Sequence, residues 1–387
     1  MEDDSGRRWL GWETALGGLL LLLGIVVLAS QALELDLGRV GWPFFVIIPG
    51  LGLLGLGLDD RFRIGVRAPS GDNTDEAAES WRCSSNVDLL GGLVHACLDD
   101  LVIALYVTID ELLGPDPRRG HPGRKPRLSD SELVCLAVAQ ILVGCPSEHR
   151  WLRFCYGRLG HLFPYLPNQP GYNKRLRQAR WLLDYVLAHL AGQTPGVHDP
   201  LRLLDATAVP CAASRETVTR SALRGWADYG WCPSHSRWYW GLKLYVLTTG
   251  DGSPIAWCLA SPRLGEREVA QALLDRRSVQ PGQVLIVDKG LAGVEMDRHV
   301  ADLQAVLVRP DRRDEPARFG SLGPVRQWVE SVIDTLKGQL GLEQHGGRSP
   351  AGVHARIVQR LLALAAGVWF NWQLGVEHKR SLVAYDH

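Results

Sequence analysis

Two long apolar runs open the chain and set its first part apart from the rest. Residues 14–33 and 40–58 contain no charged side chain, and a short charged connection, residues 34–39, separates them. Each run is about long enough to cross a hydrocarbon core of roughly 30 Å as a helix. The pattern predicts a transmembrane helical hairpin over residues 1–67, and the arginines on both sides of it place both ends in the cytoplasm.

A cleaved signal peptide and a buried core hairpin are the competing interpretations of these runs. The second run follows the first at once, and no small-residue cleavage site precedes the return of charge, which argues against a signal peptide. Pro43, Pro49 and many glycines make the second run a poor soluble helix. We therefore expect residues 14–58 to tether the chain to the cytoplasmic membrane, with the remainder in the cytoplasm. Residues 68–83 are polar, small and acidic, as in a linker.

Residues 84–200 are predicted to be helical. Ser129 and Glu132 form a capping box in front of an apolar run, and Pro146 ends that helix. The following segments mix basic and apolar residues at helical spacing, and basic helical faces can lie along DNA phosphates. A solvated surface is the alternative for each face, and no helix-turn-helix signature is present. We expect an all-α, DNA-binding domain here, with phosphate contacts from the basic residues Lys174, Arg175 and Arg177.

The pattern changes at residue 201, where short apolar runs between turn signals predict strands. One run ends at Asp205, another at Asp288, and Glu330 lies on a later helix. The expected elements are strands at 201–205, 238–249, 253–261, 284–290 and 305–310, and helices at 266–277 and 324–340. This order predicts an α/β fold with a mixed sheet flanked by helices over residues 201–345. A C-terminal helical segment, residues 346–387, follows.

Three acids from separate elements form a candidate metal site. Carboxylates are hard oxygen ligands that suit Mg²⁺ or Mn²⁺, and two such ions can promote phosphodiester chemistry. Asp205, Asp288 and Glu330 are the candidate ligands, although Asp205 or Asp288 alone would more simply be a turn or cap residue. Arg326 and Lys337 share a helical face with Glu330 and could contact phosphate.

Several other polar or aromatic residues are weaker candidates. Asp334, one turn after Glu330, could be an alternative ligand or a salt-bridge partner. Glu216 and His235 could assist at the site or be solvated at the surface. The tryptophans of residues 226–240 could stack on DNA bases or pack in the core.

Charge is distributed unevenly along the chain. The 387 residues include 42 basic and 42 acidic side chains, but residues 1–80 hold 12 acidic and 6 basic ones, so the remainder carries a net +6. A basic body behind an acidic head is a hint of nucleic-acid contact. The eight cysteines include no C-x-x-C pair, which argues against a zinc site, and we interpret them as reduced core residues of a cytosolic domain.

Residues 95–387 resemble the DDE transposases of bacterial insertion sequences, and within them the insertion-sequence family nine-eight-two of the wider insertion-sequence-four type. The resemblance rests on long stretches such as LLDATAVPC, GWADYGWCPSHSRWYWGLKLYVL, LIVDKG and PVRQWVESVIDTLKGQLGLEQHGGRSPAGV. It implies a ribonuclease-H-like fold in which Asp205, Asp288 and Glu330 are the DDE triad and hold two divalent ions. It also implies strand cleavage at the element's ends and attack of the freed 3′-hydroxyls on target DNA.

The resemblance further implies that a homodimer or larger assembly acts on double-stranded DNA. Arg326 and Lys337 match the R-x-x-x-E-x-x-x-x-x-x-K part of the wider group's signature. The chain departs from that group at two points. Gly323 stands where the group has a Tyr, and Gly290 and Leu291 follow the second acid where an aromatic is usual.

The first 60 residues have no counterpart in that family and resemble the two-helix membrane regions of bacterial cell-envelope stress proteins of the LiaF or phage-shock type. We interpret the chain as a gene fusion, in which an insertion element entered a host membrane-protein gene. Two alternatives to a transposase stay open. One is a membrane-anchored envelope-stress-type protein fused to an inactive transposase remnant, and the other is a ribonuclease-H-like nuclease without strand transfer.

Overall fold

The computed structural model describes residues 97–114, 126–232, 236–276, 279–291, 293–310 and 323–385. Ser84–His387 form one compact unit. The predicted membrane hairpin and linker lie outside the described residues. Among the helices that are described, none combines the length and the apolar character that a membrane crossing requires.

A mixed sheet forms the centre of residues 201–308. Its strands are β1 (Leu201–Ala212), β2 (Asp228–Cys232), β3 (Arg237–Thr249), β4 (Pro254–Ala260), β5 (Val284–Val287) and β6 (Val306–Val308). The strand order is β2-β3-β1-β5-β6, and β4 also pairs with β3. The β1, β5 and β6 strands are parallel, whereas β3 runs antiparallel to β1, β2 and β4. The prediction of a mixed α/β sheet is confirmed.

Helices precede the sheet, as the apolar periodicity predicts. They are α4 (Leu98–Leu113), α5 (Asp130–Leu142), α6 (Glu148–Arg158), α7 (Gln169–Gln178) and α8 (Arg180–Gln193). The predicted capping box is present, because the Glu132 amide donates to Ser129 Oγ at 3.0 Å and the Ser129 amide donates to Glu132 Oε2 at 2.5 Å. Ser147 and Asn168 cap α6 and α7 in the same way, each accepting an amide of the first turn.

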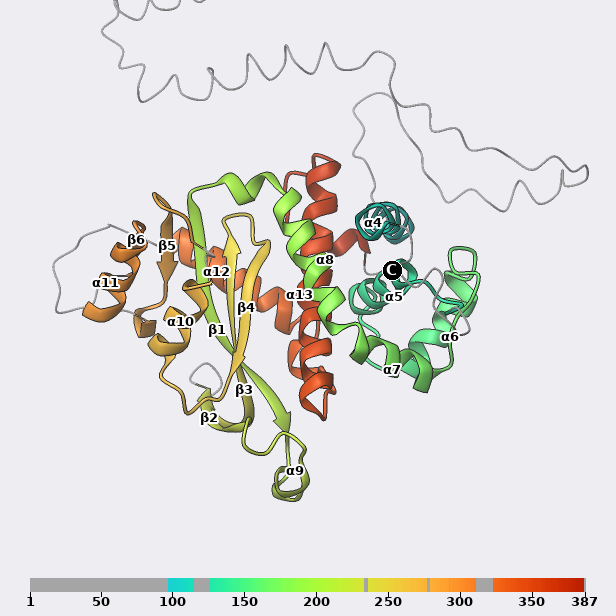
Figure 1. Cartoon of the computed structure of the whole chain (residues 1–387), viewed down its shortest axis with the longest axis horizontal. Coiled ribbons are helices and arrows are strands. Elements are labelled where there is room, and N and C mark those ends of the chain that lie inside the picture. The colour runs from blue at the N-terminus through green and yellow to red at the C-terminus, as the bar shows by residue number, and fades with distance from the viewer. Residues whose placement is uncertain are drawn as a thin grey trace, which may run out of the picture. The chain divides into compact units, whose positions relative to one another are not determined.

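Five more helices accompany the sheet, and all but the first of them pack on its two faces. They are α9 (Arg215–Arg220), α10 (Glu266–Leu274), α11 (Val294–Asp302), α12 (Gly323–Lys337) and α13 (Pro350–Gln373). Leu204, Tyr245 and Leu247 pack against α10 and α11 on one face. Val209 and Val246 point to the other face and join the core that includes α12 and α13. In Figure 1, α10 and α11 lie on the side of β5 and β6, and α8 and α13 lie beside β4.

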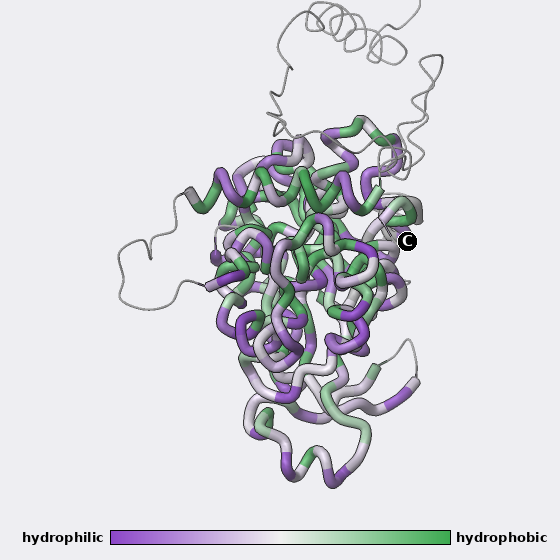
Figure 2. The backbone as a smooth tube through the Cα atoms, turned by 90° about the vertical axis from the view of Figure 1, so that its right-hand side faces the viewer, coloured by the Kyte–Doolittle hydropathy of each residue, from purple (hydrophilic) through white to green (hydrophobic). Residues whose placement is uncertain are grey.

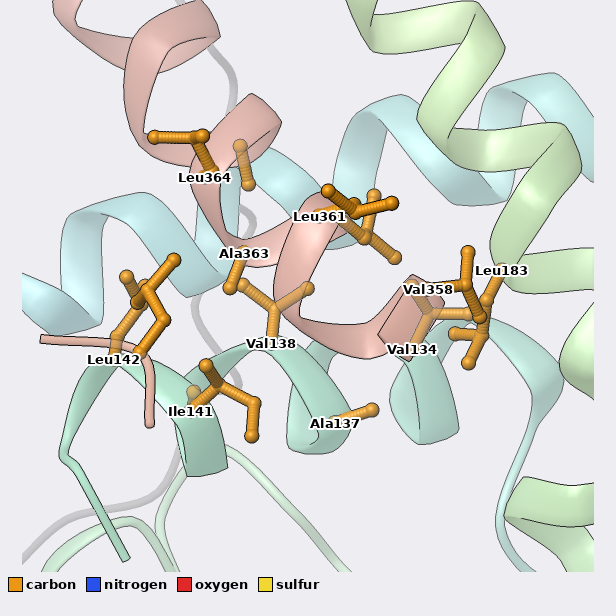
Figure 3. Packing of buried hydrophobic residues seen from close by; sticks show 14 of the residues in the cluster. Val134, Ala137, Val138, Ile141, Leu142, Leu183, Val358, Leu361, Ala363 and Leu364 are labelled. Atoms are coloured by element: carbon orange, nitrogen blue, oxygen red, sulfur yellow. The ribbon is translucent and has the colours of Figure 1, made fainter. Parts of the chain in front are cut away.

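Helix α13 is the centre of the larger core. Its side chains pack against α5 and α8, with Val358, Leu361 and Leu364 fully buried among Val138 and Leu183 (Figure 3). In Figure 2 the hydrophobic stretches, drawn in green, concentrate where the helices cross the interior of this unit. The expected DNA-binding and catalytic regions therefore share one hydrophobic core, built around a helix near the end of the chain.

The structure adds elements that the hydrophobic pattern did not indicate. β1 continues seven residues beyond Asp205, and α9, β2 and α11 were not predicted. β2 is an edge strand of alternating exposed and buried residues within a polar stretch, so its apolar signal is weak. The prediction that the first strand ends at Asp205 is wrong, because the chain beyond Asp205 stays extended and buries Val209 in the core that includes α12 and α13.

Candidate active site

Asp205 and Asp288 come from neighbouring parallel strands. Leu204 on β1 pairs with Val287, the last residue of β5. Asp205 and Asp288 are the next residues of these two chain segments, so they lie side by side. Neighbouring strands lie about 4.8 Å apart. Asp205 is half-buried and Asp288 is exposed. The sheet thus brings together two acids that are far apart in the sequence.

Burial and the neighbouring charges change the pKa of Asp205. Burial raises the pKa of the Asp205 carboxyl to about 6, and the negative charge of Asp288 also raises it. The Ala206 amide, which donates to Asp205 Oδ1 at 2.7 Å, and the cations Lys337 and Lys243 act in the opposite direction. Two acids and two lysines therefore form one interacting group, and in it the two acids repel each other.

Lys243 and Glu266 are site residues that the sequence analysis missed. Lys243 on β3 forms an ion pair with Glu266, the first residue of α10. The Glu266 carboxylate also lies beside Gly290, at the turn after Asp288, where an added Cβ would be 3.4 Å from Glu266 Oε2. A usable signal exists in the sequence, because Lys243 is the one charged residue within the mainly apolar run of residues 238–249.

Glu330 lies on the exposed side of α12. Val332, Ile333 and Leu336 form the buried side of the same helix, which packs against the face of β1 that carries Asp205. Lys337, two turns after Glu330, is the residue of α12 whose charge acts on Asp205. Glu330 therefore lies near the middle of a helix that packs against β1, two turns before Lys337.

The three predicted metal ligands are not gathered into one cluster. In the part of the chain that the structure describes, no group of three or more His, Cys, Asp or Glu side chains is placed to hold a metal ion. Asp205 and Asp288 are neighbours, whereas Glu330 and Asp334 are both exposed on α12. Arg326 belongs to α12, but its side chain is outside the described residues, as is His235.

Arg380, in the C-terminal segment of the chain, anchors α12. The Arg380 guanidinium donates to the Trp328 carbonyl at 2.7 Å and to the Ser331 hydroxyl. Gly252 lies directly against this arginine, since an added Cβ would be 2.3 Å from Arg380 Cδ. The C-terminal segment thereby holds the helix that carries Glu330.

The basic residues of α7 have different surroundings. Lys174 and Arg177 are exposed, and neither has an acidic partner among the described residues. Arg175 is half-buried, and its guanidinium bonds the Leu128 carbonyl and Asp130 Oδ1, the latter at 2.5 Å. Arg175 therefore ties α7 to the start of α5, which is a structural role that the prediction of a DNA contact did not include.

The tryptophans of residues 226–240 divide between surface and core. Trp240 is buried and Trp226 packs against the core. Trp231 and Trp238 are 45% and 68% exposed, and their rings meet edge to face with centroids 5.5 Å apart on β2 and β3. Only the exposed pair is accessible for stacking on a base. Glu216 is exposed on the short helix α9, away from the acid pair on β1 and β5.

Residues 198–366 match the family model of the transposase DDE domain. None of the curated proteins matches this chain. A solved structure of the piggyBac transposase synaptic complex with hairpin DNA is 9% identical, with a TM-score of 0.32, and the likeness covers 72% of this chain and 80% of that one. A likeness this slight adds nothing about the chain. The matched segment contains β1 to β6 and all three acids, so the sheet and the acid pair lie within a region similar to the transposase DDE domain family.

Proposed function

We propose that the chain is a DNA transposase that cuts the ends of an insertion sequence and joins their 3′-hydroxyls to target DNA. The observation that carries the proposal is the pairing of Leu204 with Val287, because it places Asp205 on β1 beside Asp288, the residue after β5. Both acids lie inside a segment that matches the transposase DDE domain. The strand order, with β1 central and β3 antiparallel to it, supports a ribonuclease-H-like fold. The closer assignment to family nine-eight-two rests on the sequence stretches alone.

The acid pair is suited to a divalent cation. Two carboxylates side by side repel each other, and the charge of Asp288 adds to burial in raising the pKa of Asp205; a bound cation would offset both effects. Hard oxygen ligands favour Mg²⁺ or Mn²⁺. We propose Asp205 and Asp288 as ligands, with Glu330 as the third, for the two ions that this chemistry uses. Two divalent ions held by these carboxylates would supply Lewis-acid activation of the attacking oxygen and stabilisation of the leaving one.

The chain's own side chains then position DNA and balance charge. Lys337 and Lys243 lie close enough to Asp205 to stabilise its ionised form, which is the form that binds a cation. Glu266 holds Lys243 in place. No protein nucleophile is needed for either step, because water and a DNA hydroxyl are the attacking groups. A dimer or larger assembly on paired DNA ends is part of the proposal.

The test compares full-length variants for metal-dependent cutting and joining of element-end DNA. Asp288→Asn should abolish both steps by removing one of the paired carboxylates, and should leave DNA binding intact. Glu330→Gln should do the same, whereas Asp334→Asn, which changes another exposed acid on α12, should leave both steps unchanged. The measurement is gel analysis of cleavage and strand-transfer products with Mg²⁺, alongside DNA binding in a chelator.

Three other results would each contradict one part of the proposal. Full activity of Asp288→Asn would show that the acid pair is not the site. Loss of activity in Asp334→Asn with full activity in Glu330→Gln would move the third ligand to Asp334. Cleavage without joining would indicate a nuclease.

The membrane tether remains a separate proposal that rests on residues 14–58. It predicts that the full-length chain sediments with the cytoplasmic membrane and resists extraction by carbonate. Recovery in the soluble fraction would contradict it. A chain that sediments with the membrane but neither cuts nor joins DNA would favour the membrane-anchored protein with an inactive remnant.

A further inference from the structure

A pocket of about 410 Å³ opens between α6, α7 and the loop that leads into α13. This pocket is separate from the acid pair, and none of Asp205, Asp288 or Glu330 lines it. Basic and polar side chains surround it, among them His149, Asn173, Arg177, Arg348 and Arg356.

Glu148 is the one acid among the described residues that line the pocket, and its charge is already neutralised. Glu148 is buried and forms an ion pair with Arg356 of α13. The Gln169 and Asn173 side-chain amides, both from α7, each donate to it at 2.7 Å. Arg356 also donates to Gln359 at 3.0 Å. This network joins α6, α7 and α13 into a fixed floor with no net charge.

Two arginines above this floor keep their charge unbalanced. Arg177 and Arg348 are both exposed, and neither forms an ion pair with any acid among the described residues. The Arg177 stem lies over the first turn of α13, since an added Cβ at Gly352 would be 3.9 Å from Arg177 Cδ. The pocket therefore combines a neutral floor with two unpaired guanidinium groups, which favours an anion.

The loop that carries Arg348 is held in a defined shape. His345 Nε2 bonds the Pro210 carbonyl of β1 at 3.0 Å, and the Gly347 amide donates to His345 Nδ1 at 3.0 Å. Gly346 has a φ of +69° and Gly347 lies against the backbone of Val353, 2.7 Å from where its Cβ would be. Neither position accommodates a side chain without strain. Arg348 is thus presented from a packed loop, which limits the entropy lost when it binds.

We infer that this pocket binds a phosphodiester group of the DNA backbone through Arg177 and Arg348, remote from the acid pair. Guanidinium groups bind phosphate oxygens in a bidentate manner. The inference rests on the proposed transposase function and deepens it, since it names a second point at which the chain holds its DNA. Pro210, to which the loop is bonded, lies five residues along β1 from Asp205, or roughly 17 Å. That is the length of about five nucleotides along one strand.

The test measures how binding of a 30-base-pair duplex by the full-length protein, in detergent and chelator, depends on salt. Each phosphate contact contributes about 0.9 to the slope of log K against log salt. Arg177→Gln and Arg348→Gln should each lower the magnitude of that slope by about 1, and the double variant by about 2. Arg298→Gln is the matched control, because Arg298 is an exposed arginine on α11 that forms no ion pair among the described residues and does not line the pocket.

An unchanged slope in the double variant, equal to that of Arg298→Gln, would overturn the inference. A second arm compares thermal unfolding in inorganic phosphate and in chloride of equal ionic strength. A phosphate stabilisation that the double variant loses, with DNA binding unchanged, would assign the pocket to a free oxyanion and also overturn the DNA contact. Failure of the transposase proposal is seen separately, as absence of DNA cutting by the wild type with Mg²⁺.

Discussion

His345 is a buried ionisable residue whose partners favour one protonation state. Its Nδ1 accepts the Gly347 amide and its Nε2 bonds the Pro210 carbonyl, so the neutral ring with its proton on Nε2 satisfies both groups. Burial, and after it the charge of Arg360, lower the pKa of His345 to about 4. Protonation would place a hydrogen on Nδ1 against the Gly347 amide.

Because of the lowered pKa of His345, we expect the free energy of unfolding to fall in acid. Because the folded-state pKa lies below the ordinary value of about 6.5, the unfolded chain binds the proton more strongly between those two values. The contribution of neutral His345 is therefore complete above about pH 6.5 and is lost as the pH falls to about 4. The loss is on the order of 3 kcal/mol in the free energy of unfolding.

The measurement is urea unfolding of the wild type and of His345→Gln at several pH values. The variant is expected to be less stable at neutral pH, and the difference between the two should shrink as the pH falls. A difference that stays constant from pH 7 to pH 4 would show that His345 does not titrate in this range.

The sequence correctly marks the position of Asp288 at the end of a strand but not that of Asp205. The end of an apolar run marked Asp288, and its place one residue after β5 confirms that signal. Asp205, by contrast, lies inside β1, and only the pairing of β1 with β5 puts it beside Asp288. Lys243 and Glu266 escaped notice because their pairing joins a strand and a helix 23 residues apart.

At the scale of elements, local signals located most helices and strands. The capping box at Ser129 marks the first turn of α5, and the turn around Gly252, with a φ of +89°, joins β3 to β4. The elements that escaped prediction are short or lie at an edge of the sheet. α9 has no buried residue, so no apolar periodicity could reveal it.

This contrast between α5 and α9 can be tested with two caps. Ser129→Ala removes an acceptor for the Glu132 amide at the start of a helix that is almost wholly buried, and should lower the free energy of unfolding by about 1 kcal/mol. Ser214→Ala removes the equivalent cap of α9 but should change it by less than about 0.5 kcal/mol, because α9 can fray without exposing core. Equal losses, measured by thermal unfolding, would contradict this reasoning.

At the scale of the whole molecule, α13 joins what the sequence pattern separates. It packs on α4, α5, α7, α8 and β4, and its side chains belong to the same core as Val209 and Val246 of the sheet. The Trp369 indole also donates to Gln193 of α8 at 2.9 Å, and the Trp372 indole bonds Asp251 between β3 and β4. The helical region and the sheet should therefore unfold together.

Leu361→Ala tests that cooperativity. Leu361 is fully buried in the core, so its truncation should cost about 2–5 kcal/mol. Hydrogen exchange should show the loss in α5 and in β3 alike, because both depend on α13. A loss confined to the helices would show that the sheet is stable without them.

The sequence by itself determined the local features: the apolar runs, the capping box, the hairpin around Gly252, and three acids in a stretch typical of a transposase. These depend on residues near one another in the chain, whose periodicity and turn chemistry are visible directly. Only the tertiary structure decided that Asp205 and Asp288 are neighbours, that Lys243 and Glu266 join them, and that Arg177 and Arg348 face one pocket. The reason is physical. Those contacts follow from strand register and from the packing of α13, which arise from many distant side chains acting together.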